Sequence, residues 1–113
     1  MNIQIFGTKK SFDTKKAARW FKERGINYQL IDMKEKGMSQ GEFRSITQSV
    51  GGADKLVDEK AKDKDLLALL RYLSDADKAE KIFENQQIIA APIVRNGKKA
   101  TIGFQPDVWK EWE

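Results

Sequence analysis

The residues best placed to do chemistry lie near the start of the chain, in the segment Lys9–Lys16, which runs Lys-Lys-Ser-Phe-Asp-Thr-Lys-Lys. Two hydroxyls and four ammonium groups gather there, where a loop meets a predicted helix. Main-chain N–H groups at a helix start attract phosphate-like anions. Alternatively, Ser11 or Asp13 caps the helix of a solvated loop, and the lysines serve solubility. The segment therefore predicts either an anion site or a capped, solvated loop.

The chain contains no cysteine and no histidine. Disulfides, thiol redox chemistry, zinc–thiolate sites and Ser-His-Asp catalysis are therefore excluded. A serine nucleophile needs an adjacent base, and the lysines near Ser11 lie in a polar loop and not in the buried setting that a lysine base requires. We expect no catalytic residue, no metal and no cofactor.

The composition predicts one soluble globular domain that spans residues 1–113. Hydrophobic residues make up 40% and charged residues 34% of the chain. No apolar run approaches the ~20 residues that cross a bilayer, and no signal peptide precedes the first strand, so we expect a cytoplasmic protein with no membrane contact. The formal net charge of +4 is compatible with an anionic partner without identifying one.

The first part of the chain predicts a strand, a helix and a second strand. Ile3 and Ile5 alternate within a strand over 2–6. A helix over about 14–24 follows and ends at a glycine. A strand over 27–32 comes next, with three side chains expected to be buried: Tyr28, Leu30 and Ile31.

Helix signals dominate the middle of the chain. Ser39 and Glu42 have capping-box spacing, and Gly51-Gly52 ends that helix. A leucine-rich helix over 65–73 is predicted to be buried, and Ser74 begins another helix.

The last part predicts a hairpin and a final helix. Strands over 88–95 and 98–104 flank Asn96-Gly97, a strong hairpin signal, and Pro106 suits the first turn of a helix. The aromatic side chains are expected to pack in the core instead of stacking on nucleic acid, and we expect no direct nucleic-acid contact: Trp20, Phe104, Trp109 and Trp112.

The order β-α-β, helices, β-β-α favours an α/β fold with a small mixed sheet. Three anchors also resemble the ArsC/Spx family of glutaredoxin-like proteins: Thr14–Phe21 after the opening strand, the turn Gly25–Tyr28 into the second strand, and the run Ala91-Pro92-Ile93-Val94 followed by Gly97–Phe104 with its Gly-Lys and Gly-Phe pairs. The resemblance implies a thioredoxin-like fold with a helical insert over about 39–86. It also implies that the Ala91–Pro92 bond is cis and faces the loop over 7–14.

This chain departs from the family pattern at the positions that carry its chemistry. The family's active-site cysteine aligns with Ser11, and Thr14 stands where redox-sensing members have a second cysteine. The arginines of arsenate reductases are also absent, and the residues at or nearest their positions are Ala91, Lys60 or Lys62, Gln105 and Pro106. Nucleophile and oxyanion-binding groups are missing together, which argues against reductase chemistry.

The resemblance therefore implies a non-catalytic binding or regulatory protein, of the type of the Spx transcription regulators, with Ser11 at a vestigial nucleophile position. Two alternatives stay open: an oxidoreductase of the arsenate reductase family with altered chemistry, and a binder of a small anion or a thiol peptide. A ligand would contact Lys10, Ser11, Thr14, Ala91 and Pro92. A protein partner from the transcription machinery is expected, and in Spx proteins a glycine near Gly51-Gly52 lies on the surface that contacts RNA polymerase. We expect a monomer.

Overall fold

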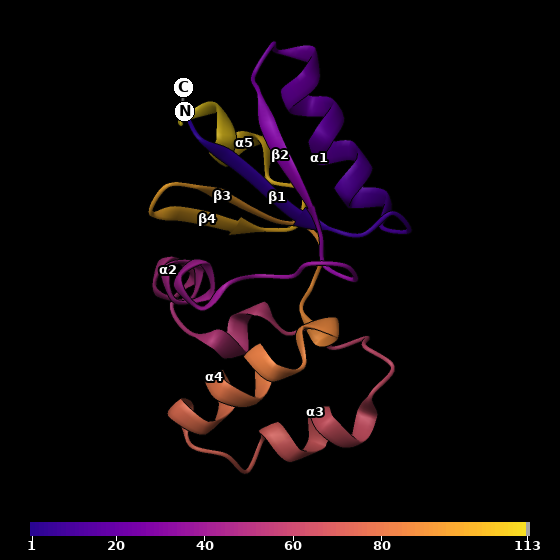
Figure 1. Cartoon of the computed structure of the whole chain (residues 1–113), viewed down its shortest axis with the longest axis vertical. Helices are drawn as coiled ribbons and strands as arrows, with labels where there is room; N and C mark the ends of the chain where they lie inside the picture. The colour runs from indigo at the N-terminus through magenta and orange to yellow at the C-terminus, as the bar shows by residue number, and fades with distance from the viewer. Residues whose placement is uncertain (113) are drawn as a thin grey trace.

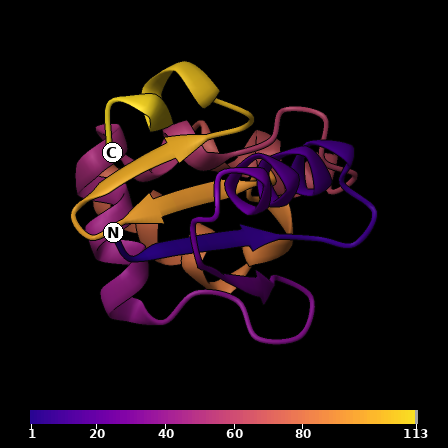
Figure 2. The ribbon, with the colours of Figure 1, turned by 90° about the horizontal axis from the view of Figure 1, so that it is seen from above.

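A four-stranded mixed sheet forms the centre of the computed structural model, which describes residues 1–112 (Figure 1). The strands are β1 (Ile3–Gly7), β2 (Tyr28–Asp32), β3 (Ile93–Asn96) and β4 (Lys99–Ile102). They lie side by side in the order β2-β1-β3-β4, as Figure 2 shows from above. Strand β1 is parallel to β2 and antiparallel to β3, and β3 is antiparallel to β4. The predicted mixed sheet is therefore confirmed.

Two helices pack on one face of the sheet: α1 (Phe12–Glu23) and α5 (Pro106–Lys110). Trp20 and Phe21 of α1 pack against Trp109 of α5, with ring centroids 5.4 and 5.0 Å away. The Trp109 indole N–H donates a hydrogen bond to Thr101 Oγ1 on β4, 2.8 Å away. The predicted core role of Trp20 and Trp109 is confirmed, because each is buried.

The helical insert covers the other face of the sheet and fills the lower part of Figure 1. Its elements are α2 (Gln40–Val50), the 3-10 turn η1 (Ala53–Leu56), α3 (Lys64–Leu70), α4 (Asp75–Glu84) and the 3-10 turn η2 (Gln86–Ile88). Ser39 and Glu42 form the predicted capping box, and Ser74 caps α4. Phe6 and Ile31 of the sheet share a core cluster with side chains of the insert, so the insert and the sheet are packed together.

Two burial predictions are wrong. Leu30 is 55% exposed because β2 is an edge strand that pairs with β1 alone. Helix α3 is not buried, since among its residues only Leu70 is buried and Leu69 is 44% exposed. Helix α3 lies at the far end of the insert, where neighbouring elements cover only one side of it (Figure 1).

Several element ends also differ from the predictions. Helix α1 begins two residues early, at Phe12, because Ser11 is its cap. The strand predicted from residue 88 begins at Ile93, since residues 86–88 form a 3-10 turn and Ile89 makes only an isolated bridge to Val57. Helix α3 ends at Leu70 and β4 ends at Ile102.

Candidate functional site

Ser11 joins the start of α1 to the segment that leads into β3. Its Oγ accepts a hydrogen bond from the Thr14 N–H at 3.1 Å, which makes Ser11 the N-cap of α1. The Ser11 hydroxyl donates to the Ala91 carbonyl at 3.4 Å, across 80 positions of sequence. The expected vestigial position and the residue before Pro92 therefore lie in contact.

The Ala91–Pro92 segment is held in place by hydrogen bonds on both sides. Ala90 N–H donates to the Leu56 carbonyl, and Gly103 N–H donates to the Pro92 carbonyl, each at 2.8 Å. Pro92 is fully buried, and the Ala91–Pro92 peptide bond is cis. The Ala91 carbonyl thus faces Ser11 from a rigid support.

A hollow of about 360 Å³ opens beside this contact. Gln86 is one of its lining residues, and its side-chain amide accepts a hydrogen bond from Met38 N–H at 2.7 Å and donates one to the Met38 carbonyl at 3.1 Å. Nothing in the sequence pattern points to Gln86, whose partner is 48 positions away. The hollow is lined by Thr8, Met33, Lys34, Gln86, Gln87, Ile89 and Ala91.

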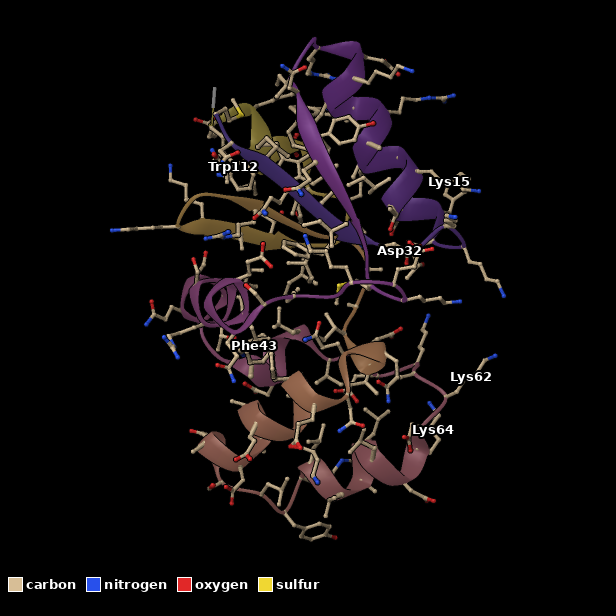
Figure 3. All side chains as sticks on the ribbon, viewed as in Figure 1. Lys15, Asp32, Phe43, Lys62, Lys64 and Trp112 are labelled. Carbon is tan, nitrogen blue, oxygen red and sulfur yellow. The ribbon has the colours of Figure 1, made fainter. Side chains whose placement is uncertain are left out.

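The lysines of the loop do not converge on Ser11. Lys9 and Lys15 line a different groove, between α1 and β2, and Figure 3 shows Lys15 pointing outward from α1. Lys16 Nζ lies over the Phe104 ring, 4.4 Å from its centroid. Lys10, which we expected to contact a ligand, is exposed, and no described contact links it to Ser11. This arrangement favours the capped, solvated loop over an anion site at Ser11.

Thr14, another expected ligand contact, is 4% exposed. Its Oγ1 has no hydrogen-bond partner within residues 1–112. The side chain packs against Gly7, where an added Cβ would lie only 2.5 Å from Thr14 Oγ1. Thr14 therefore acts as a packing residue under the loop.

Phe12 is a site residue that the sequence analysis missed. It follows Ser11 in the first turn of α1 and is 74% exposed. Lys16 Nζ lies 6.0 Å from the Phe12 ring centroid, so Phe12 and Phe104 flank one ammonium group. An apolar residue at the first helical position, next to a polar cap, was the signal for this exposure.

No basic side chain reaches Ser11 from the positions where the resemblance expects the arginines of arsenate reductases. Lys60 and Lys62 are exposed in the turn before α3, and Gln105 Nε2 donates to the Ile102 carbonyl.

Among residues 1–112, no three acidic side chains gather in a way that could hold a metal ion. No helix in the same range is long and apolar enough to span a bilayer. The groups at Ser11 can form hydrogen bonds and an apolar contact.

Comparisons with known proteins place this geometry in a family. The chain is 28% identical over 109 residues to the global transcriptional regulator Spx 2 of Oceanobacillus iheyensis, covering 95% of this chain and 80% of the relative. A structure from Staphylococcus aureus COL is 31% identical, covers 96% of each chain and superposes with a TM-score of 0.78. An arsenate reductase from Vibrio cholerae, 24% identical, covers 98% of this chain and 97% of its own, with a TM-score of 0.82.

These similarities confirm the predicted thioredoxin-like, ArsC/Spx-like fold. Residues 6–112 match the sequence profile of the ArsC family, which is almost the whole chain. The chain therefore belongs to the ArsC family.

Proposed function

We propose that this chain is a non-catalytic binding protein of the ArsC family that acts by contacting a protein partner. The observation that carries the proposal is the pair of hydrogen bonds at Ser11. Its Oγ accepts from Thr14 N–H and its hydroxyl proton is directed to the Ala91 carbonyl. A hydroxyl engaged on both sides, in a chain without histidine or cysteine, has no base to activate it as a nucleophile.

The surface around Ser11 supports protein contact. Phe12 offers an exposed aromatic ring on a rigid helix start, and aromatic anchors beside pockets are typical of binding hot spots. The hollow beside Ala91 adjoins the same Ser11–Ala91 contact. The relative from O. iheyensis is a transcriptional regulator. We therefore propose RNA polymerase as the partner to test first.

Biolayer interferometry measures the binding of the full chain to RNA polymerase purified from the organism that encodes this chain. We expect saturable binding that Phe12→Asp weakens by about tenfold or more, since a hot-spot aromatic contributes upwards of ~2 kcal/mol. Val108→Asp is the matched control, because Val108 is a 41% exposed apolar residue on α5. Absence of binding, or equal binding of the Phe12→Asp variant, would contradict the proposal.

A second candidate function rests on the hollow beside Ala91. Its volume of about 360 Å³ is enough for a small ligand such as a thiol peptide. Titration of the isotope-labelled chain with glutathione and, separately, with arsenate would test it by NMR. Saturable shifts confined to the lining of the hollow would favour a small-ligand binder over a protein partner.

A further inference from the structure

The two edge strands of the sheet differ in how well their outer sides are covered by other elements. At the β4 edge, α2 packs alongside, and Ser49 Oγ accepts the outward N–H of Ala100 at 2.8 Å. At the β2 edge, the strand pairs with β1 alone, and Gln29 and Leu30 are exposed. Proteins commonly protect such edges with lysine, proline or a bulge. Strand β2, with the sequence Tyr-Gln-Leu-Ile-Asp, contains neither lysine nor proline.

The main chain of Leu30 faces away from the sheet. Just after β2, the main chain of Met33 faces β1, because its N–H donates to the Gly7 carbonyl at 2.9 Å. Alternate residues of a strand direct their main-chain groups to the same side, so Ile31 also faces β1. The N–H and C=O of Leu30, one residue earlier, therefore point away from β1 to the open side of the sheet. Within residues 1–112, no strand pairs with β2 on this side. The two Leu30 groups are spaced to receive another extended chain.

A groove of about 370 Å³ lies beside this edge, on the α1 side. Leu30 is in register with Ile5, whose side chain belongs to the core cluster under α1, so the Leu30 side chain faces the same way. Leu30 and Ala18 form the apolar part of the groove, and Lys9 and Lys15 line it from the loop and from α1. An apolar side chain with an adjacent negative charge would fit this lining.

The acidic residues of the groove lie together at one end. Asp32 ends β2 and Glu35 lies in the turn that follows. Asp32 Oδ1 accepts a hydrogen bond from Lys34 N–H at 2.9 Å, which holds this carboxylate in the turn after β2. The two lysines of the groove come instead from α1 and from the loop before it, so the charge on the α1 side of the groove is basic.

We propose that the β2 edge binds an extended segment of a partner protein. The segment adds a strand to the sheet, pairs its main chain with Leu30, places an apolar side chain in the groove and directs an acidic side chain to Lys15. Strand addition of this kind takes its affinity from main-chain hydrogen bonds and its specificity from side-chain pockets. This surface goes beyond the proposed contact around Ser11 and does not depend on which partner binds there.

The charge on α1 favours an acidic partner over a second copy of this chain. Lys15 and Lys22 lie three residues before and four residues after Ala18, so they share its helix face. A symmetric pairing of two β2 edges would bring two such basic faces together, and like charges oppose that association. An acidic segment meets the same lysines with attraction.

Selection of a displayed library of short random peptides on the immobilised full chain tests the proposal. We expect enrichment of peptides in which Asp or Glu lies two residues from an apolar residue, so that both side chains face α1, and NMR shifts centred on residues 28–32 on binding. Leu30→Asp should weaken these peptides by about tenfold or more, while Val108→Asp leaves their affinity unchanged. Leu30 is 55% exposed, so the folded state tolerates this change.

A second variant, which reverses the charge of Lys15, tests the proposal without changing Leu30. Lys15→Glu should reverse the selection, so that basic peptides replace acidic ones. A library that yields no enriched peptide, peptides that bind Leu30→Asp as well as the natural chain, or shifts at Phe12 in place of β2 would each overturn the proposal. Concentration-dependent dimers abolished by Leu30→Asp would also overturn it, because they would assign the edge to a second copy.

Discussion

Ser11 Oγ lies 3.4 Å from the Ala91 carbonyl oxygen and 3.1 Å from the Thr14 main-chain nitrogen. One hydroxyl thus caps α1 and ties it to the segment that enters β3. In a family member with a cysteine at this position, the same geometry would place a thiol at a helix N-terminus. In this chain the Ser11 hydroxyl connects two parts of the fold through these hydrogen bonds.

Replacing Ser11 by cysteine should give a thiol with a pKa below the ordinary ~8.5, because the main-chain N–H groups at the start of α1 stabilise the thiolate. The chain contains no other cysteine, so the pH dependence of thiolate absorbance reports this group alone. The same residue placed at exposed Arg44 on α2 provides a control thiol in a helix interior. A pKa at Ser11→Cys equal to or above the control would show that Ser11 does not occupy a nucleophile position. We do not expect Ser11→Cys to reduce arsenate, since Ala91 and Gln105 stand where arginines are expected.

Gly7→Ala should lower the free energy of unfolding by about 1–3 kcal/mol, the usual cost of overpacking. The added methyl group would lie 3.0 Å from Thr14 Cβ and 2.5 Å from Thr14 Oγ1. Thr14→Ala removes the hydroxyl and the methyl group that clash, so the double variant should be more stable than the sum of the single changes predicts. Urea unfolding of all four proteins measures this coupling. Strictly additive effects would mean that Gly7 and Thr14 do not meet.

The stabilisation from Glu42 should depend on pH in the acid range. Partial burial raises the pKa of the Glu42 carboxyl, but hydrogen bonds from the Ser39 main chain, from Gln4 and from the Ser39 hydroxyl, with the Arg95 charge, lower it more. The net pKa in the folded chain is below its ordinary value of 4.5. A depressed pKa means that Glu42 stabilises the fold above its unfolded pKa of ~4.3 and loses this effect as the pH falls through the folded value.

Glu42→Gln isolates this dependence, because glutamine keeps the size of the side chain and cannot ionise. The natural chain should be the more stable of the two at neutral pH, and the difference should shrink on acidification below about pH 4.3. Urea unfolding at a series of pH values gives the difference directly. A difference that grows on acidification would contradict the network that joins Gln4, Glu42 and Arg95.

The parts of the fold that could be predicted from the sequence depend on short-range signals. The caps Ser39 and Ser74 and the hairpin at Asn96-Gly97 are defined within a few residues of each element, and the structure contains all three. The exposure of Leu30 and Leu69 depends on which elements lie beside them, and an apolar residue alone does not reveal that.

The candidate site divides in the same way. The Ser11 cap has a local pattern, whereas the approach of Ala91 to Ser11 joins residues 80 positions apart and came from the family resemblance. No sequence pattern predicts the hydrogen bonds between Gln86 and Met38, because the partner of an amide side chain depends on which main-chain groups the fold places beside it. Lys9, Lys15 and Lys16 looked like one basic cluster in sequence. In the structure they are divided between a groove and an aromatic contact.

We predict that this ArsC family member binds a partner and does not reduce arsenate. The rate of arsenate reduction by the purified chain, with glutathione and glutaredoxin or with thioredoxin as the electron source, tests this prediction. We expect a rate equal to that of the buffer, because no side chain in the sequence can form a thiol–arsenic adduct. Arsenate reduction that rises with the concentration of the chain, and that follows it through purification, would show that the chain is an enzyme.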